Sequence, residues 1–135
     1  MVADALSGRL VVQDDVGTHS TVLEDGAGYP GLPGVSKTSI HVSADPAIRF
    51  NLVEFAAGSE VPPHASRTMN YWFVLAGSIE SVVPGREPVT LERGDCCVQA
   101  GVDHGWRVRD DACAALLAVV VDMQSKPELS RTDAW

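Results

Sequence analysis

Residues 58–77 decide the fold, and they read Gly-Ser-Glu-Val-Pro-Pro-His-Ala-Ser-Arg-Thr-Met-Asn-Tyr-Trp-Phe-Val-Leu-Ala-Gly. Within them His64 follows a Pro-Pro turn and precedes a run that alternates as a β-strand does. A second histidine, His104, stands in a similar setting in residues 101–108, Gly-Val-Asp-His-Gly-Trp-Arg-Val. If the strands between them fold back on one another, the two imidazoles face each other.

The rest of the chain predicts an all-β protein. Short β-prone runs are separated by turns rich in Gly, Pro and Asp, and no stretch has the pattern of an amphipathic helix. Such a pattern is typical of a β-sandwich or barrel, and the jelly roll is its natural closed form. The expected strands are 9–14, 19–24, 37–43, 48–55, 71–77, 78–83, 89–92, 96–100, 106–109 and 113–122.

At 135 residues the chain fits one compact domain, for which we expect three parts. Residues 1–35 should form N-terminal strands and a Gly/Pro-rich loop or flap, over 25–35, that packs on a barrel. The barrel itself should span residues 36–122, and residues 123–135 should form a polar C-terminal tail.

The charge balance excludes some partners. With 10 basic and 18 acidic residues the net charge is −8, which opposes binding to nucleic acid or to an anionic membrane. The three cysteines have no Cys-x-x-Cys spacing, so we expect small buried thiols in a reducing, cytoplasmic setting. Neither a secretory signal nor an apolar run of membrane-spanning length is present, which also favours the cytoplasm.

Residues 58–77 resemble the first motif of the cupins, G-x5-H-x-H-x3,4-E-x6-G. Gly58, His64 and Gly77 match in step, whereas Ser66 stands at the second histidine and Asn70 at the glutamate.

The second cupin motif, G-x5-P-x-G-x2-H-x3-N, is matched more loosely. Gly101 and His104 are in step with it, Gln99 replaces the proline, and Val108 replaces the asparagine. The resemblance covers residues 50–121 and implies a cupin jelly-roll barrel of the small, single-domain cupin 2 type, similar to members found in small-molecule and polyketide-tailoring pathways.

Cupins usually hold a divalent metal on three histidines and one glutamate. Here Ser66 and Asn70 remove one imidazole and the only formal negative charge, and a metal held by two neutral donors competes poorly with water. We therefore expect either no cofactor or one weakly held Fe, Mn, Ni or Zn ion on His64 and His104. Glu60 is a possible extra donor.

Strand alternation directs one set of side chains to a common lumen. They are His64, Ser66, Asn70, Trp72, His104 and Trp106. The histidines suit acid–base chemistry near neutral pH. Ser66 and Asn70 can hold a carbonyl or enolate oxygen or merely bond to backbone, and the tryptophans can wall a cyclic substrate or simply fill the core.

These residues favour an enzyme acting on a small molecule. The leading hypothesis is an acid–base lyase, isomerase or cyclase, which dehydrates, decarboxylates or closes a ring in a cyclic or polyketide-like metabolite. The alternatives are a metal-dependent cupin dioxygenase and a cupin that binds a small ligand without chemistry. The same alternation directs Tyr71, Phe73 and Leu75 outward, which predicts a homodimer.

Overall fold

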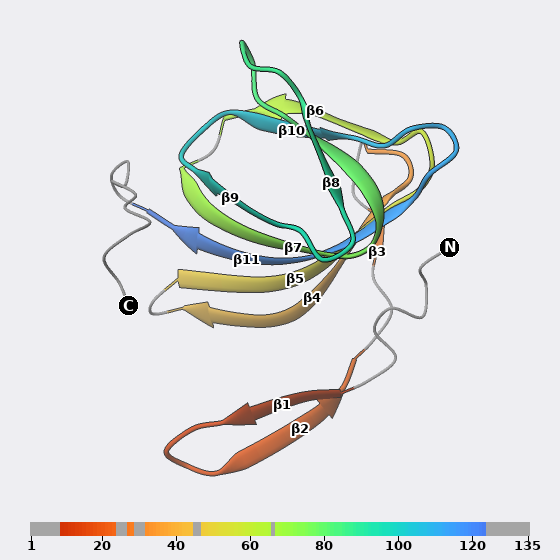
Figure 1. Ribbon diagram of the computed structural model, residues 1–135. Helices are drawn as coiled ribbons and strands as arrows, with labels where there is room; N and C mark the ends of the chain where they lie inside the picture. The colour runs from red at the N-terminus through yellow and green to blue at the C-terminus, as the bar shows by residue number, and fades with distance from the viewer. Residues whose placement is uncertain (1–8, 24–26, 29–31, 45–46, 66, 124–135) are drawn as a thin grey trace.

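The computed structural model describes residues 9–23, 27–28, 32–44, 47–65 and 67–123. Throughout these ranges the chain forms strands, turns and loops with no helix, which confirms the all-β prediction (Figure 1). Most of the C-terminal tail and part of the loop predicted over 25–35 lie outside the described residues. The strands are β1 Arg9–Gln13, β2 Thr18–Val22, β3 Ala27–Gly28, β4 Val35–Ala44, β5 Ala47–Phe55, β6 Glu60–His64, β7 Thr68–Val82, β8 Val89–Glu92, β9 Cys96–Ala100, β10 His104–Arg107 and β11 Ala114–Asp122.

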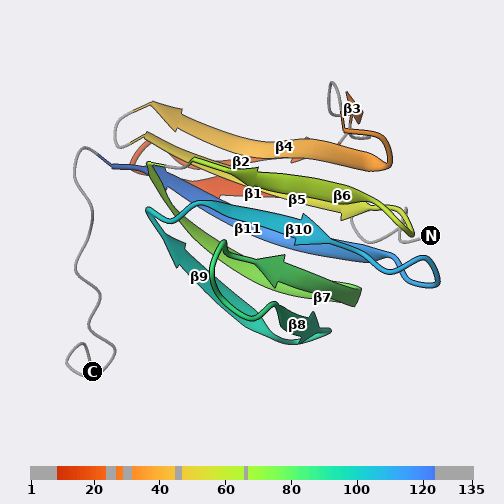
Figure 2. The ribbon, with the colours of Figure 1, turned by 90° about the horizontal axis from the view of Figure 1, so that it is seen from above.

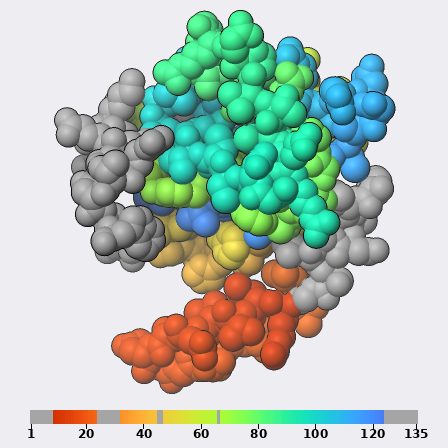
Figure 3. Space-filling view, viewed as in Figure 1, coloured from red at the N-terminus to blue at the C-terminus, as the bar shows by residue number. Residues whose placement is uncertain are grey.

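Strands β1 and β2 form an antiparallel hairpin with a sheet of its own. Its turn is fixed by Asp14, whose carboxylate accepts the backbone N–H groups of Val16 and Gly17 at 2.9 and 3.1 Å. In Figures 1 and 3 the hairpin projects from one side of the barrel. Its valines Val11 and Val22 are exposed.

The remaining nine strands form one sheet in the order β3-β4-β5-β11-β7-β10-β6, with β8 and β9 also paired to β7. Figure 2 shows β4, β5, β11 and β7 in succession. Figure 1 shows the sheet curling so that β6 and β10 lie across from β4 and β5. The curled sheet is the predicted jelly-roll barrel, and its interior holds the candidate site.

Strand β7 corrects the prediction of two strands over 71–77 and 78–83, because it runs unbroken from Thr68 to Val82. Its first part pairs with β11 and β9, and its last part with β10 and β8. At the change of partners Gly77 has a φ of 78°, and a Cβ there would collide with the Cys113 carbonyl. Gly77 therefore bends one strand around the barrel instead of reversing the chain.

Strand β6 was missed in the sequence, where Pro62 and Pro63 were interpreted as a turn. The strand lies at the end of the sheet order and pairs only with β10. An edge strand tolerates proline because one of its sides needs no ladder hydrogen bonds. Its partner β10 begins at His104, two residues before the predicted start.

The contact between β6 and β10 has a register shift that brings His64 opposite His104. Trp106 pairs with Val61, so residues 62–63 lie opposite Gly105 alone. A Cβ on Gly105 would meet the Val61 carbonyl, so only glycine lets the two backbones approach this closely.

Alternation along β7 separates the core from the surface as predicted. Trp72 and Val74 are buried, whereas Tyr71 and Phe73 are exposed on the outer face. The outward row is where the sequence predicts a second copy of the chain. Cys96 pairs with Phe73 and is also exposed, so the prediction that it is buried was wrong.

Candidate active site

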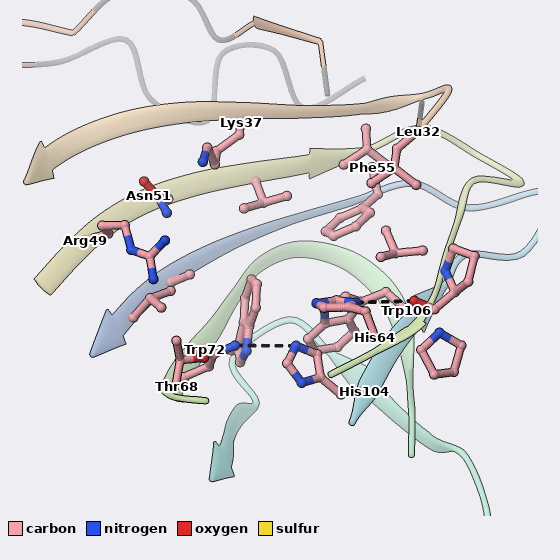
Figure 4. Close-up of a pocket in the computed structure, with 18 of the residues that line it drawn as sticks. Leu32, Lys37, Arg49, Asn51, Phe55, His64, Thr68, Trp72, His104 and Trp106 are labelled. Atoms are coloured by element: carbon pink, nitrogen blue, oxygen red, sulfur yellow. Dashed lines mark hydrogen bonds between the residues drawn. The ribbon is translucent and has the colours of Figure 1, made fainter. Parts of the chain in front are cut away.

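The barrel encloses a pocket of about 610 Å³, which is large enough for a drug-sized small molecule (Figure 4). Figure 4 shows His64, His104 and Trp106 on one side and Lys37, Arg49 and Asn51 on the opposite side. The lining residues are Leu32, Val35, Lys37, Arg49, Asn51, Val53, Phe55, Val61, Pro62, Pro63, His64, Ala65, Arg67, Thr68, Asn70, Trp72, His104, Trp106, Ala118 and Val120.

His104 is 3% exposed and is held by hydrogen bonds on both ring nitrogens. Its Nδ1–H donates to the Val102 carbonyl at 3.0 Å. The Asn70 amide nitrogen lies 3.4 Å from Nε2 and can only donate, so Nε2 is the acceptor. Burial lowers the pKa of His104 below its ordinary value of 6.5, against the opposing effect of the Val102 bond. The ring is therefore neutral at neutral pH, with its lone pair at Nε2.

His64 lies beside His104 at the pocket margin. The ring centroids are 4.7 Å apart with an interplanar angle of 62°, so the edge of one ring faces the other. The His64 residue is exposed, and its Nδ1–H donates to the Pro62 carbonyl at 3.3 Å. One imidazole of the pair thus contacts solvent and the other is shielded from it.

Asn70 links His104 to β7. Its Oδ1 accepts the Thr68 hydroxyl at 2.6 Å, while its amide nitrogen donates to His104. Asn70 is buried, and both ends of its amide are engaged, so it orients the imidazole. Ser66, which the sequence predicted beside it, lies outside the described residues.

Trp72 and Trp106 meet at the floor of the pocket, with centroids 4.9 Å apart in an edge-on arrangement. The ring centroids of Trp106 and Phe55 are 6.3 Å apart. The indole N–H of Trp72 donates to Gln99 Oε1 at 3.0 Å, and the Gln99 amide nitrogen donates to the Ser81 hydroxyl at 3.2 Å. Both tryptophans belong to the core and to the pocket wall at once.

The donors in the described part of the chain do not fit the metal site that cupins usually carry. No group of three or more His, Cys, Asp or Glu side chains gathers there. Glu60, the possible extra donor, pairs with Arg107 one position from the inward Val61–Trp106 pair. It therefore points away from the lumen and is not among the lining residues.

Sequence reasoning missed the side of the pocket formed by β4 and β5. Lys37, Arg49 and Asn51 line it, and Arg67 adds a third cation. Asn51 interrupts the apolar run of residues 50–53, and Arg49 shares its face two residues earlier. A polar residue inside a buried strand is the signal that could have indicated this wall.

Residues 51–121 match the family model of the cupin domain, which is just over half of the chain. The protein therefore belongs to the cupin family. In the described residues no helix is long and apolar enough to span a membrane.

Among curated proteins, the chain is 32% identical over 118 residues to phomopsin biosynthesis cluster protein C' of Diaporthe leptostromiformis. That alignment covers 87% of this chain and 55% of the relative, so the chain spans about half the length of the relative.

Solved structures with the same fold include a polyketide cyclase and KdgF. The polyketide cyclase RemF of Streptomyces resistomycificus has a TM-score of 0.63 at 19% identity, over 84% of this chain and 82% of that one. KdgF of Halomonas sp. has a TM-score of 0.61 at 20% identity, over 75% and 90% of the two chains.

Proposed function

We propose that this cupin is an acid–base enzyme, a lyase, isomerase or cyclase, that acts on a small molecule in natural-product biosynthesis. The observation that carries the proposal is the neutral, shielded His104 whose Nε2 lone pair lies in a pocket beside a second, solvent-exposed histidine. Burial favours the unprotonated imidazole that a general base requires, and the bonds to Val102 and Asn70 fix its orientation.

The proton transfers follow from this asymmetry. Nε2 of His104 accepts a proton from an activated C–H bond of the ligand, replacing the long hydrogen bond from Asn70. The C–H electron pair then forms a new C=C bond, and in an elimination the C–O bond breaks as His64 donates a proton to the departing oxygen. His64 acts here in its protonated form, so His104 ends protonated and His64 neutral. Transfer of the proton from His104 to the adjacent His64, directly or through a water, then restores both states without net consumption of a proton. In an isomerisation the same proton returns to another atom of the ligand, so no further reactant is needed.

The setting in natural-product biosynthesis is supported by the relatives. The name of the Diaporthe leptostromiformis protein places that protein in a biosynthesis cluster, and RemF is a polyketide cyclase with the same fold. Ring-forming steps on polycarbonyl compounds require a positioned base, and dehydrations also require a proton donor for the departing oxygen.

The base can be tested before the substrate is known, by the elimination of 5-nitrobenzisoxazole. In this reaction a base removes one C–H proton, the N–O bond breaks, and a coloured phenolate forms. We expect the wild type to accelerate the reaction above buffer, and His104→Gln to lower kcat/KM by about 100-fold or more. The rate should rise with pH through a pKa below 6.5, because burial lowers the pKa of His104.

A matched control is His41→Gln, since His41 lies on β4 and does not line the pocket. This variant should keep the wild-type rate. Equal rates in wild type and His104→Gln would contradict the proposal. So would a stoichiometric metal in protein purified without chelators, if the metal is lost together with the rate in both His64→Ala and His104→Ala.

A further inference from the structure

The basic side chains that line the pocket contrast with the acidic composition of the protein as a whole. The chain has 10 basic and 18 acidic residues, yet the described lining residues include Lys37, Arg49 and Arg67 and no Asp or Glu. Random placement would favour acids at the pocket, so this inversion is a property of the site. A cleft of one sign concentrates ligands of the other sign.

The amide of Asn51 adds a second observation. Asn51 is 6% exposed and lines the pocket, and its side chain makes no hydrogen bond to any described residue. Figure 4 shows it on β5 between Lys37 and Arg49. No fully buried side-chain nitrogen or oxygen of the described residues lacks a partner, so the Asn51 amide reaches the pocket surface, where a ligand or its solvent substitute can bond to it.

Arg49 has hydrogen-bond donors for the same ligand. Its Nη2 donates to Asp122 Oδ1 at 2.7 Å, an ion pair that occupies one of its N–H groups and leaves the others available. Arg49 and Asn51 are two residues apart on β5 and therefore share its inward face. A planar guanidinium with a neighbouring amide donor matches a carboxylate, which accepts parallel hydrogen bonds.

We infer that this wall is a carboxylate subsite, in which Arg49 and Asn51 bind an acidic group of the ligand while its apolar body lies against Phe55, Trp72 and Trp106. The inference rests on the proposed function in so far as this ligand is the substrate. The carboxylate at β5 then directs the other end of the molecule toward His64 and His104. Figure 4 shows these two histidines across the pocket from Arg49 and Asn51. The substrate class is an organic acid with an apolar, ring-sized body.

The test is calorimetric titration with 2-naphthoate, with its neutral isostere 2-naphthamide and with 2-naphthyl phosphate. We expect naphthoate to bind about tenfold more tightly than naphthamide, since charge-assisted hydrogen bonds are worth this much or more. Arg49→Gln should remove that difference by weakening naphthoate alone. Arg86→Gln makes the same change in net charge in the turn between β7 and β8, away from the pocket, and should change neither affinity.

Asp122→Asn separates a ligand role of Arg49 from a purely structural one. Without the Asp122 carboxylate, Arg49 loses its competing partner, so naphthoate should bind about threefold or more tightly than in the wild type. A structural ion pair predicts no gain in this variant. Equal binding of naphthoate and naphthamide, equal weakening of both in Arg49→Gln, weaker naphthoate binding in Asp122→Asn, or tighter binding of the phosphate than of naphthoate would each overturn the inference.

The two proposals fail separately. His104→Gln should lose the elimination of 5-nitrobenzisoxazole and still bind naphthoate more tightly than naphthamide, because Arg49 and Asn51 are unchanged. A wild type that discriminates naphthoate from naphthamide but has no elimination activity would refute the acid–base function and leave the subsite standing. Elimination activity without discrimination would refute the subsite alone.

Discussion

Two buried amides of this barrel, Gln99 on β9 and Asn51 on β5, are almost equally shielded, at 4% and 6% exposed. Gln99 accepts from Trp72 and donates to Ser81, so both ends of its amide are satisfied inside the protein. Asn51 faces the pocket and has no hydrogen bond to the described residues. The difference indicates that the Gln99 amide stabilises the fold, whereas the Asn51 amide is open to the pocket and can bind a ligand there.

Gln99 also accounts for a departure from the cupin pattern. The cupin motif usually has proline at this position. Here the Gln99 amide accepts a hydrogen bond from the Trp72 indole and so fixes its orientation. The same strand carries Cys97, and burial raises the pKa of its thiol, which argues against a thiolate nucleophile at this end of the barrel. Polar groups on this side are therefore structural, and the chemistry belongs to the pocket.

Of the substitutions that test this comparison, Gln99→Leu should change the free energy of unfolding most. The substitution leaves the Trp72 N–H buried without an acceptor and removes the donor to Ser81, so the free energy of unfolding should fall by about 1–3 kcal/mol. Chemical denaturation measures it, with Val98→Thr as a control on the exposed face of the same strand. The control should change the free energy of unfolding by less than about 0.5 kcal/mol. An unchanged stability in Gln99→Leu would mean that the Trp72–Gln99 bond is not structural.

Asn51→Val should change the free energy of unfolding in the opposite direction from Gln99→Leu and by a smaller amount. No internal hydrogen bond is lost, and a β-branched apolar residue suits a central strand. The free energy of unfolding should stay the same or rise by up to about 1 kcal/mol. The same variant should bind 2-naphthoate more weakly. A loss of stability as large as that of Gln99→Leu would show that Asn51 holds the barrel together and would remove the contrast between the two amides.

The sequence predicted much of the fold in outline, although not the contrast between these two amides. The turns at Gly and Pro predicted the positions of most strands. Alternation in residues 71–77 correctly separated the inward side chain of Trp72 from the outward side chains of Tyr71 and Phe73. Strand β6 was missed because its two prolines indicate a turn, and only the pairing with β10 makes it an edge strand. Gly77 was interpreted as a strand end because a bend and a reversal have the same local signal.

The site was predicted from the sequence only in part. The motif spacing drew attention to His64, Asn70 and His104, which the structure places together. The wall of Arg49 and Asn51 depends on which face of β5 meets the lumen, and that is set by the order β4-β5-β11-β7, a property of distant pairings. Local alternation shows that Arg49 and Asn51 share a face, but it does not show which cavity that face lines.

His104 differs from both amides. It is buried and hydrogen-bonded within the protein, as Gln99 is, but it can change its charge. In the folded protein its pKa is lowered, chiefly by burial, from an ordinary value of 6.5, so the unfolded chain binds the proton more readily. The contribution of this group is therefore fully present above pH 6.5, and the free energy of unfolding falls as the pH drops below that value toward the lowered folded pKa.

His104→Asn should reduce this slope between about pH 7 and about pH 5.5, a window above the titration of most carboxyl groups. Urea denaturation across that range measures the slope, and His41→Asn, which alters an exposed imidazole, should retain it. An identical slope in wild type and His104→Asn would place His104 with the satisfied structural groups such as Gln99 and would remove the physical reason for treating it as the base.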